Sequence, residues 1–517
     1  MRKLMFLVLV FLFSACGNVV TKKHVIDATD SDTVNDDNTQ TDSDTTGSDE
    51  NNDLENPDLT TDDVADQEPD FDAITDEEND NTADEDQADN EPVDNDSASD
   101  PRIDLTGPDF TGSTVLILNG SPDGETSASS GTFTNPFLTV KNTPLSNSGH
   151  LLRNDLRPPL PKGLKAPLII DSSVKKSLPH VPKFVKGDKD TIYVYDFSTG
   201  KEVGMPSTLQ YVGTHIEIWK ADDVNVSAQD MQSIANEFDN EVYGLVTENF
   251  YSEADIDENG KVSIILANLG GFAAGYFNPA DYYTKEEYPN SNHRDLIYIE
   301  SSMGNAEIFS TMAHEFQHLV HSNKNILIED DWNSGELPYR YIDEGLATAA
   351  QHMYEGLQEE MVYIINDSGY NQSIGEGNSF IYWDYSDEMK VYSDYAMAYV
   401  FFQYLRIRAG NDTTIYNEII DCTSNDYTCV EAAITSRVDS DYTFTDFLLD
   451  FRIALILQDK SGSYGFNNES GFSFTMPYFE GTSVSLRGGG GVYISSNGNF
   501  VKPSNAGNSL IFAGIND

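Results

Sequence analysis

The chain has 517 residues, of which 38% are hydrophobic and 11% aromatic, enough to bury a large core. Its formal net charge is −57, from 30 basic and 87 acidic residues. This balance argues against nucleic-acid binding and against a polybasic membrane-surface protein, because both need clustered Lys and Arg. With three cysteines the chain is not a disulfide scaffold, so its stability must come from packing.

Residues 1–16 have the features of an export signal. Arg2 and Lys3 precede an apolar run over residues 4–13, which is too short to span a bilayer. The segment resembles a bacterial lipoprotein signal, in which small residues precede an obligatory cysteine. It predicts cleavage before Cys16, lipidation of that residue and a membrane anchor in the bacterial cell envelope, facing the periplasm or the exterior. An ordinary secretory signal with an incidental cysteine is the alternative.

Residues 17–105 are expected to form a disordered acidic tether. Residues 27–101 alone hold 30 acidic residues and no Lys or Arg, so they cannot bury enough apolar surface to offset chain entropy. Like charges repel and extend such a chain. We interpret it as a spacer that holds a folded domain off the membrane; a weak calcium-collecting tail is the alternative.

The folded part divides into three segments by composition. Residues 106–185 are a β-rich or irregular lead-in, with strands expected at 114–118 and 168–170. Residues 461–517 return to β signals, with strands expected at 492–495 and 510–513. No segment after the signal reaches 18 apolar residues, so none is expected to span a membrane.

Between these segments, residues 186–460 mix strands and helices. Alternating or β-branched runs predict strands, and three- and four-residue apolar spacing predicts helices. The expected strands cover 191–196, 208–219, 261–266 and 295–299. The expected helices cover 226–246, 306–322, 337–356 and 393–407, the last largely buried. The fold class is therefore α+β, with β-rich segments at both ends.

Residues 314–318 read His-Glu-Phe-Gln-His inside the expected helix 306–322. Positions i and i+4 share one helix face, about 6 Å apart along the axis, so His314 and His318 can converge on one zinc ion. Glu315 would lie beside the metal and take a proton from the attacking water. The alternative is a helix with two structural histidines.

Zinc needs a third protein ligand, for which Glu344 is the favoured residue. It lies on the next expected helix among apolar and small residues, where an unpaired carboxylate would be costly. His321 is too far along the axis from His314, roughly 10.5 Å, and is interpreted as structural or solvent-facing. Lys324 stands where a metzincin would have its third histidine, which argues against that class.

His-Glu-x-x-His followed by Glu-Gly-Leu-Ala resembles a gluzincin, and residues 186–460 resemble the hyicolysin family of secreted bacterial metallopeptidases. The resemblance rests on short matching segments in the same order around the motif: 211–215, 237–240, 247–250, 255–262 and 291–294. It implies a zincin fold, a zinc cofactor, protein or peptide substrates and endopeptidase activity. Asp343 stands where many gluzincins have Asn.

Gluzincins often use a Tyr or His downstream of the glutamate ligand to stabilise the developing oxyanion. Tyr392 and Tyr395, three residues apart on one helical face, are the candidates for this catalytic role, with simple packing as the alternative. Thr348 is a candidate for a hydrogen bond to a metal ligand.

Asp255, Asp257 and Asn259, followed by Gly260, match the opening of a calcium-binding loop. The twelfth position is Leu266 rather than Glu, so a complete EF-hand is absent. A polar turn that leads into a strand explains the pattern equally well.

Cys422 and Cys429 are expected to form a disulfide, because the chain carries an export signal. Taken together, the sequence predicts a lipid-anchored zinc endopeptidase. Two other hypotheses stay open: a non-catalytic surface adhesin or structural lipoprotein with a degenerate zincin domain, and an amidase that acts on cell-wall peptides.

Overall fold

The structure is a computed structural model that describes residues 100–136, 158, 183–328, 340–385, 387–422, 424 and 426–517. These residues fall within one contact unit, Ala98–Asp517. The predicted signal, the lipidation site Cys16, nearly all of the predicted tether and the strand expected at 168–170 lie outside the described residues. Among the described residues, no helix combines the length and the apolar composition needed to cross a membrane.

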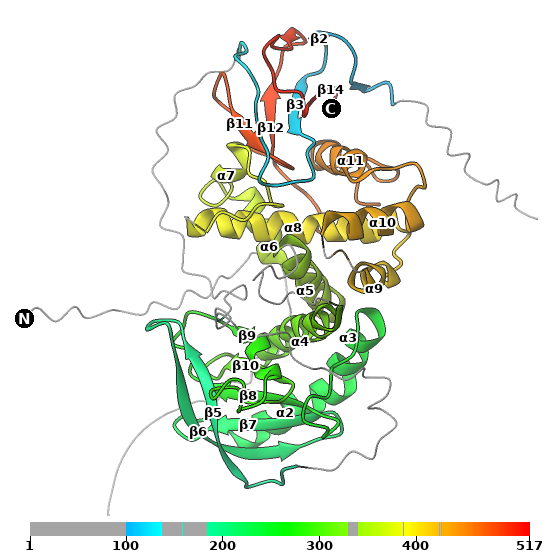
Figure 1. The fold of residues 1–517 in the computed structure, drawn as a ribbon. Helices are drawn as coiled ribbons and strands as arrows, with labels where there is room; N and C mark the ends of the chain where they lie inside the picture. Colours follow the sequence, from blue (N-terminus) through cyan, green and yellow to red (C-terminus); the bar gives the residue numbers. More distant parts are fainter. Residues whose placement is uncertain are drawn as a thin grey trace, which may run out of the picture. The chain divides into compact units, whose positions relative to one another are not determined.

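A six-stranded mixed sheet carries the first half of the predicted catalytic region (Figure 1). Its strands, in spatial order, are β5 (Lys189–Asp196), β6 (Lys201–Val212), β7 (Ile216–Ala221), β8 (Val262–Ala267), β10 (Leu296–Glu300) and β9 (Gly275–Phe277). The strands β7, β8 and β10 pair in parallel, and the other neighbours pair antiparallel. All residues of β8 and β10 are buried, as apolar strands covered on both faces should be.

The β structure expected at 208–219 is present as two strands, because the chain turns back between β6 and β7. Asp239 accepts hydrogen bonds from the amides of Thr214 and His215, both at 2.7 Å, and so holds the turn. A Cβ on Gly213 would lie 2.3 Å from Oδ2 of Asp239, so a side chain there would disturb this carboxylate. Continuous β-forming residues on both sides of the turn conceal it in the sequence.

Helices cover one face of this sheet. α2 (Ala228–Glu237), the π-helical turn η1 (Phe238–Val242) and α3 (Tyr243–Asn249) follow one another where a single helix was expected. α4 (Asn305–Ile328) follows β10, and its apolar side shares a core with these helices and with the inner face of β7, β8 and β10. The 3-10 turn η2 (Pro279–Tyr282) follows β9. A separate apolar cluster that includes Trp219, Ile265 and Tyr298 packs on the other face.

The second half of the catalytic region is helical. It consists of α5 (Arg340–Glu355), α6 (Glu359–Asn366), α7 (Gln372–Gly375), α8 (Glu388–Arg408), α9 (Thr414–Asp421), α10 (Tyr427–Arg437) and α11 (Phe444–Leu457). α8 is buried from Val391 to Ile407, which confirms the expectation for that segment. A disulfide between Cys422 and Cys429 joins the end of α9 to α10.

Segments from both ends of the unit form one β region, where the sequence suggested two separate ones. A four-stranded sheet has the order β1 (Ile103–Asp104), β14 (Leu510–Ile515), β3 (Thr114–Asn119) and β12 (Gly491–Ser495). Two short ribbons join β2 (Asp109–Phe110) to β13 (Phe500–Val501) and β4 (Ser127–Ser129) to β11 (Ser485–Arg487). Figure 1 shows the N-terminal strands in cyan beside the C-terminal strands in red. The described chain is thus an α+β protein, as expected.

Candidate metal centre

The helix α4 brings His314, Glu315 and His318 into the interior of the protein. Its apolar residues, among them Met312 and Phe316, face the core and leave the histidines one turn apart on the adjoining face. All three polar side chains are fully buried. Groups of this kind are costly to bury unless partners or a metal ion satisfy them.

Glu344 on α5 completes a tight group with the two histidines. The Nε2 atoms of His314 and His318 are 3.0 Å apart, and each lies 3.3 Å from Oε2 of Glu344. Ligands bound about 2.1 Å from a tetrahedral zinc ion are separated from one another by roughly 3.4 Å. The three atoms therefore match three corners of a zinc site, and their two nitrogens and one oxygen suit that metal.

The outer nitrogens of both histidines are held by hydrogen bonds. Nδ1 of His318 donates to Oδ1 of Asp343 at 3.0 Å, and Nδ1 of His314 donates to Oε1 of Gln351 at 2.9 Å. With the proton on Nδ1, the lone pair of each Nε2 faces the centre of the group, as a metal ligand requires. Burial lowers the pKa of His314, which keeps its ring neutral.

The carboxylate of Glu344 has partners on both oxygens. Nη1 of Arg340 lies 3.3 Å from its Oε1, and the hydroxyl of Tyr395 donates to its Oε2. Tyr395 therefore reaches the group from α8, and the ring of Trp383 packs against it with ring centroids 5.0 Å apart. Both contacts restrict the orientation of the Glu344 carboxylate.

The other predicted tyrosine points elsewhere. The hydroxyl of Tyr392 donates to Oε1 of Glu388 on its own helix at 3.1 Å, and its ring packs against Tyr370. The hydroxyl of Thr348 donates to the main-chain carbonyl of Glu344 at 2.8 Å rather than to its carboxylate. Of these three candidates, the structure brings only Tyr395 to the metal group.

Glu315 lies where α4 meets the edge strand β9. A Cβ added to Gly275 of β9 would lie 2.7 Å from Cγ2 of Thr311, 2.8 Å from the carbonyl oxygen of Tyr298 and 2.9 Å from Cγ of Glu315. The missing side chain at Gly275 thus lets the last strand of the sheet run directly beside Glu315.

The predicted calcium-binding group is made up of different residues in the structure. Ligand oxygens of Asp255, Asp257 and Asp295 lie within 4.8 Å of one another, so Asp295 replaces Asn259 as the third member. Oδ1 of Asn259 accepts the amide of Lys261 at 2.7 Å, and its Nδ2 donates to Asp257 at 3.0 Å.

Sequence reasoning missed Gln351 and Asp295, which are far in the sequence from the residues they join. The only sequence signal for Asp295 is a charged residue at the start of an apolar strand, and Gln351 has none beyond its helix. His321 is buried, with Nδ1 3.5 Å from Oδ1 of Asp343, so a structural role fits and a solvent-facing one does not.

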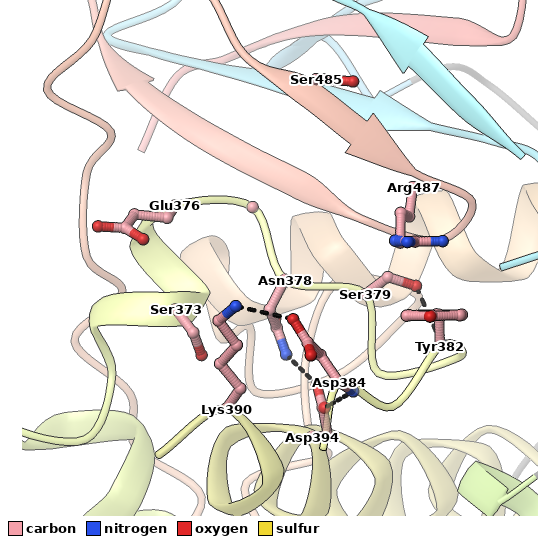
Figure 2. A pocket seen from close by; sticks show the side chains of 11 residues that line it. Ser373, Glu376, Asn378, Ser379, Tyr382, Asp384, Lys390, Asp394, Ser485 and Arg487 are labelled. Atoms are coloured by element: carbon pink, nitrogen blue, oxygen red, sulfur yellow. Dashed lines mark hydrogen bonds and ion pairs between the residues drawn. The ribbon is translucent and has the colours of Figure 1, made fainter. Parts of the chain in front are cut away.

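A polar cavity of about 230 Å³ lies on a neighbouring face of α8 (Figure 2). Its floor is the nearly buried Asp394, which accepts hydrogen bonds from Nδ2 of Asn378 at 2.7 Å and the amide of Asp384 at 3.3 Å. Burial raises the pKa of Asp394 well above its usual range. Lys390 pairs with Asp384 at 2.7 Å. Asp394 directly precedes Tyr395, so this cavity flanks the metal group without sharing a side chain with it.

Comparison with known proteins gives one relative that bears on the site. The neutral metalloprotease ShpI of Staphylococcus hyicus is 32% identical over 285 residues. The match covers 52% of this chain and 63% of ShpI, so the chain spans less than two thirds of that relative's length. No family model matches the chain. The likeness supports a relationship to metalloproteases and agrees with the buried metal-type group.

Proposed function

We propose that the chain is a zinc-dependent endopeptidase with a zincin fold, in which His314, His318 and Glu344 hold the metal. The observation that carries the proposal is the geometry of these three side chains. Their ligand atoms are buried and 3.0–3.3 Å apart, and each histidine has its outer nitrogen bonded. The likeness to ShpI supports it.

Bound zinc would polarise the scissile carbonyl and lower the pKa of the attacking water. Glu315, next to His314 on α4, accepts a proton from that water and delivers it to the leaving amine. The hydroxyl of Tyr395, already at Glu344, is the better placed of the two tyrosines to donate to the oxyanion that develops.

The position of strand β9 supports a peptide as the substrate. It is the last strand of its sheet, and it passes Glu315 at Gly275. An extended peptide can add to such an edge through main-chain hydrogen bonds, which would bring its carbonyl groups past the metal group. We infer that an unstructured stretch of a protein binds along this edge.

Substitution of Glu315 by Gln tests the mechanism. The variant should keep one zinc per chain, because the ligands remain, and should lose casein hydrolysis by at least about 100-fold, because the proton acceptor is gone. Zinc is measured by elemental analysis and hydrolysis with and without a chelator. The matched control is Glu307→Gln, an exposed residue of the same helix, which should retain wild-type activity.

The rival functions give different results in the same experiment. Wild-type activity in Glu315→Gln would rule out the proton-transfer role. A wild-type chain with neither zinc nor hydrolysis would favour the adhesin. Zinc with hydrolysis of cell-wall peptides, but not of casein, would favour the amidase.

We also propose that Cys16 anchors the enzyme to a membrane of the cell envelope through a lipid. The support is the sequence of residues 1–16 alone.

A further inference from the structure

A second group of acidic side chains lies at one edge of the six-stranded sheet, apart from the zinc ligands. Asp255 and Asp257 belong to the loop that precedes β8, and Asp295 directly precedes β10. Because β8 and β10 are parallel neighbours, their N-terminal ends meet at the same edge. There the three side chains bring ligand oxygens within 4.8 Å of one another.

Two buried glutamates add to the negative charge around this group. Glu217 is fully buried and Glu253 is 5% exposed, and one carboxylate oxygen of each has no hydrogen-bond partner among the described residues. Glu217 acts electrostatically on Asp257 and Glu253 acts on Asp295, so both carboxylates add to the negative potential at these aspartates. Oδ1 of Asp257 is likewise buried without a partner. These buried oxygens without hydrogen-bond partners are independent of the clustering of the aspartates. Because burying unpartnered carboxylate oxygens is costly, they indicate a bound cation.

Two basic side chains that act electrostatically on this acidic region also bond to other groups. Arg294 donates from Nη2 to Asp190 at 2.6 Å and from Nε to the Asn292 carbonyl at 3.3 Å. Lys261 donates to the carbonyls of Gly213 and Thr214. Both side chains thus make hydrogen bonds outside the group of three aspartates, and Arg294 also acts electrostatically on Asp257.

Asp295 is arranged as an ionised carboxylate. Its two oxygens accept the amides of Ala254 and Ile256, and such donors favour the charged form. Burial and the neighbouring acids act in the opposite direction and raise its pKa well above its usual range. A bound cation removes this conflict, because it compensates both the burial and the repulsion.

We propose that Asp255, Asp257 and Asp295 bind one calcium ion. An all-oxygen group on a loop suits calcium, which accepts six to eight oxygen ligands in flexible geometry, whereas zinc prefers nitrogen and sulfur. The ion would join the loop before β8 to the start of β10, and β10 leads into α4. It would therefore stabilise the sheet that supports the zinc ligands without touching them. The proposal does not depend on peptidase activity.

The test uses the full chain, freed of metal on a chelating resin and reloaded with one equivalent of zinc. Calcium binding is measured by equilibrium dialysis with radioactive calcium, and stability by thermal unfolding. At calcium a hundredfold above its dissociation constant, the unfolding midpoint should rise by roughly 3 °C. Magnesium at the same concentration should raise it by less than half as much.

Two variants and one matched control separate this site from the acidic segment 27–101, which is identical in all of them. Asp257→Asn and Asp295→Asn should bind the specific calcium ion at least tenfold more weakly and lose the rise in midpoint. Asp222→Asn, an exposed residue at the end of β7, should behave as wild type. Asp257 is partly exposed, so its variant is expected to fold, which near-ultraviolet circular dichroism checks.

Three outcomes would overturn the proposal. One is the absence of a midpoint rise in the wild type. Another is wild-type calcium binding and midpoint rise in a folded Asp257→Asn variant, which would assign the binding to other acids. The third is an equal rise with magnesium, which would overturn the assignment to calcium.

Discussion

The two histidines of the metal group differ in the partners that hold them. His318 donates to a carboxylate, Asp343, whereas His314 donates to an amide, Gln351. Gln351 is itself oriented, because its Nε2 donates to the hydroxyl of Ser310, which donates onward to Glu355. A carboxylate partner makes an imidazole a stronger ligand than an amide does, so the two nitrogens offered to the metal are unequal.

Gln351→Ala should weaken zinc binding by about 10- to 100-fold, because the ring of His314 loses the contact that fixes its tautomer and orientation. Competition with a chromophoric chelator measures the zinc dissociation constant. Gln372→Ala, which removes an exposed amide on α7, is the control and should bind zinc as wild type does. An unchanged zinc dissociation constant in a folded Gln351→Ala variant would contradict the positioning role.

At the scale of the elements, β9 and α4 approach each other closely beside Glu315. Gly275→Ala would place a methyl group against Thr311, Glu315 and the carbonyl oxygen of Tyr298, and a main-chain atom cannot move aside cheaply. We expect a loss of about 1–3 kcal/mol in the free energy of unfolding, measured by urea denaturation. Gly244→Ala in α3 is the control, since nothing lies within 4 Å of its added Cβ. Equal stability of the two variants would contradict the close approach.

Elements with a clear local pattern could be predicted from the sequence. The three- and four-residue spacing of apolar positions predicted α4, and apolar β-branched runs predicted β8 and β10. The three residues of β9 are too few to show a period, and α11 is so largely apolar that its apolar positions show no clear helical spacing. Its sequence, FTDFLLDFRIALIL, escaped prediction for that reason.

The residues of the two metal groups could likewise be predicted only where the sequence around them carries a signal. His314 and His318 could be singled out because their spacing is local, and Glu344 because burial of a lone carboxylate is costly. Gln351 and Asp295 could not, because nothing near them in the sequence indicates which side chain each would meet. Their assignment required the packing of α4 on α5 and of β8 on β10.

For the whole molecule, the proposed lipid anchor should determine where the protein is located in the cell without changing its peptidase activity. Cys16→Ser should move the protein from the membrane fraction to the soluble fraction of cells, because the residue that would carry the lipid is gone. Casein hydrolysis per molecule should not change, since the metal group lies within the unit Ala98–Asp517. Cell fractionation with immunoblotting measures the first effect. Continued membrane association of Cys16→Ser would contradict the lipid anchor.

The β region built from both ends of the unit has a consequence for biosynthesis. β3 lies between β12 and β14, and the hydroxyl of Ser113 next to it donates to the carbonyl of Ile515, 402 residues further along the chain. A protein that leaves the ribosome or an export channel N-terminus first must keep β3 without these neighbours until β12 and β14 emerge. A chain cut short before β14 would present the unpaired edge of β3, the kind of surface that proteases and chaperones bind. The four-stranded sheet can therefore form completely only after synthesis has passed β14.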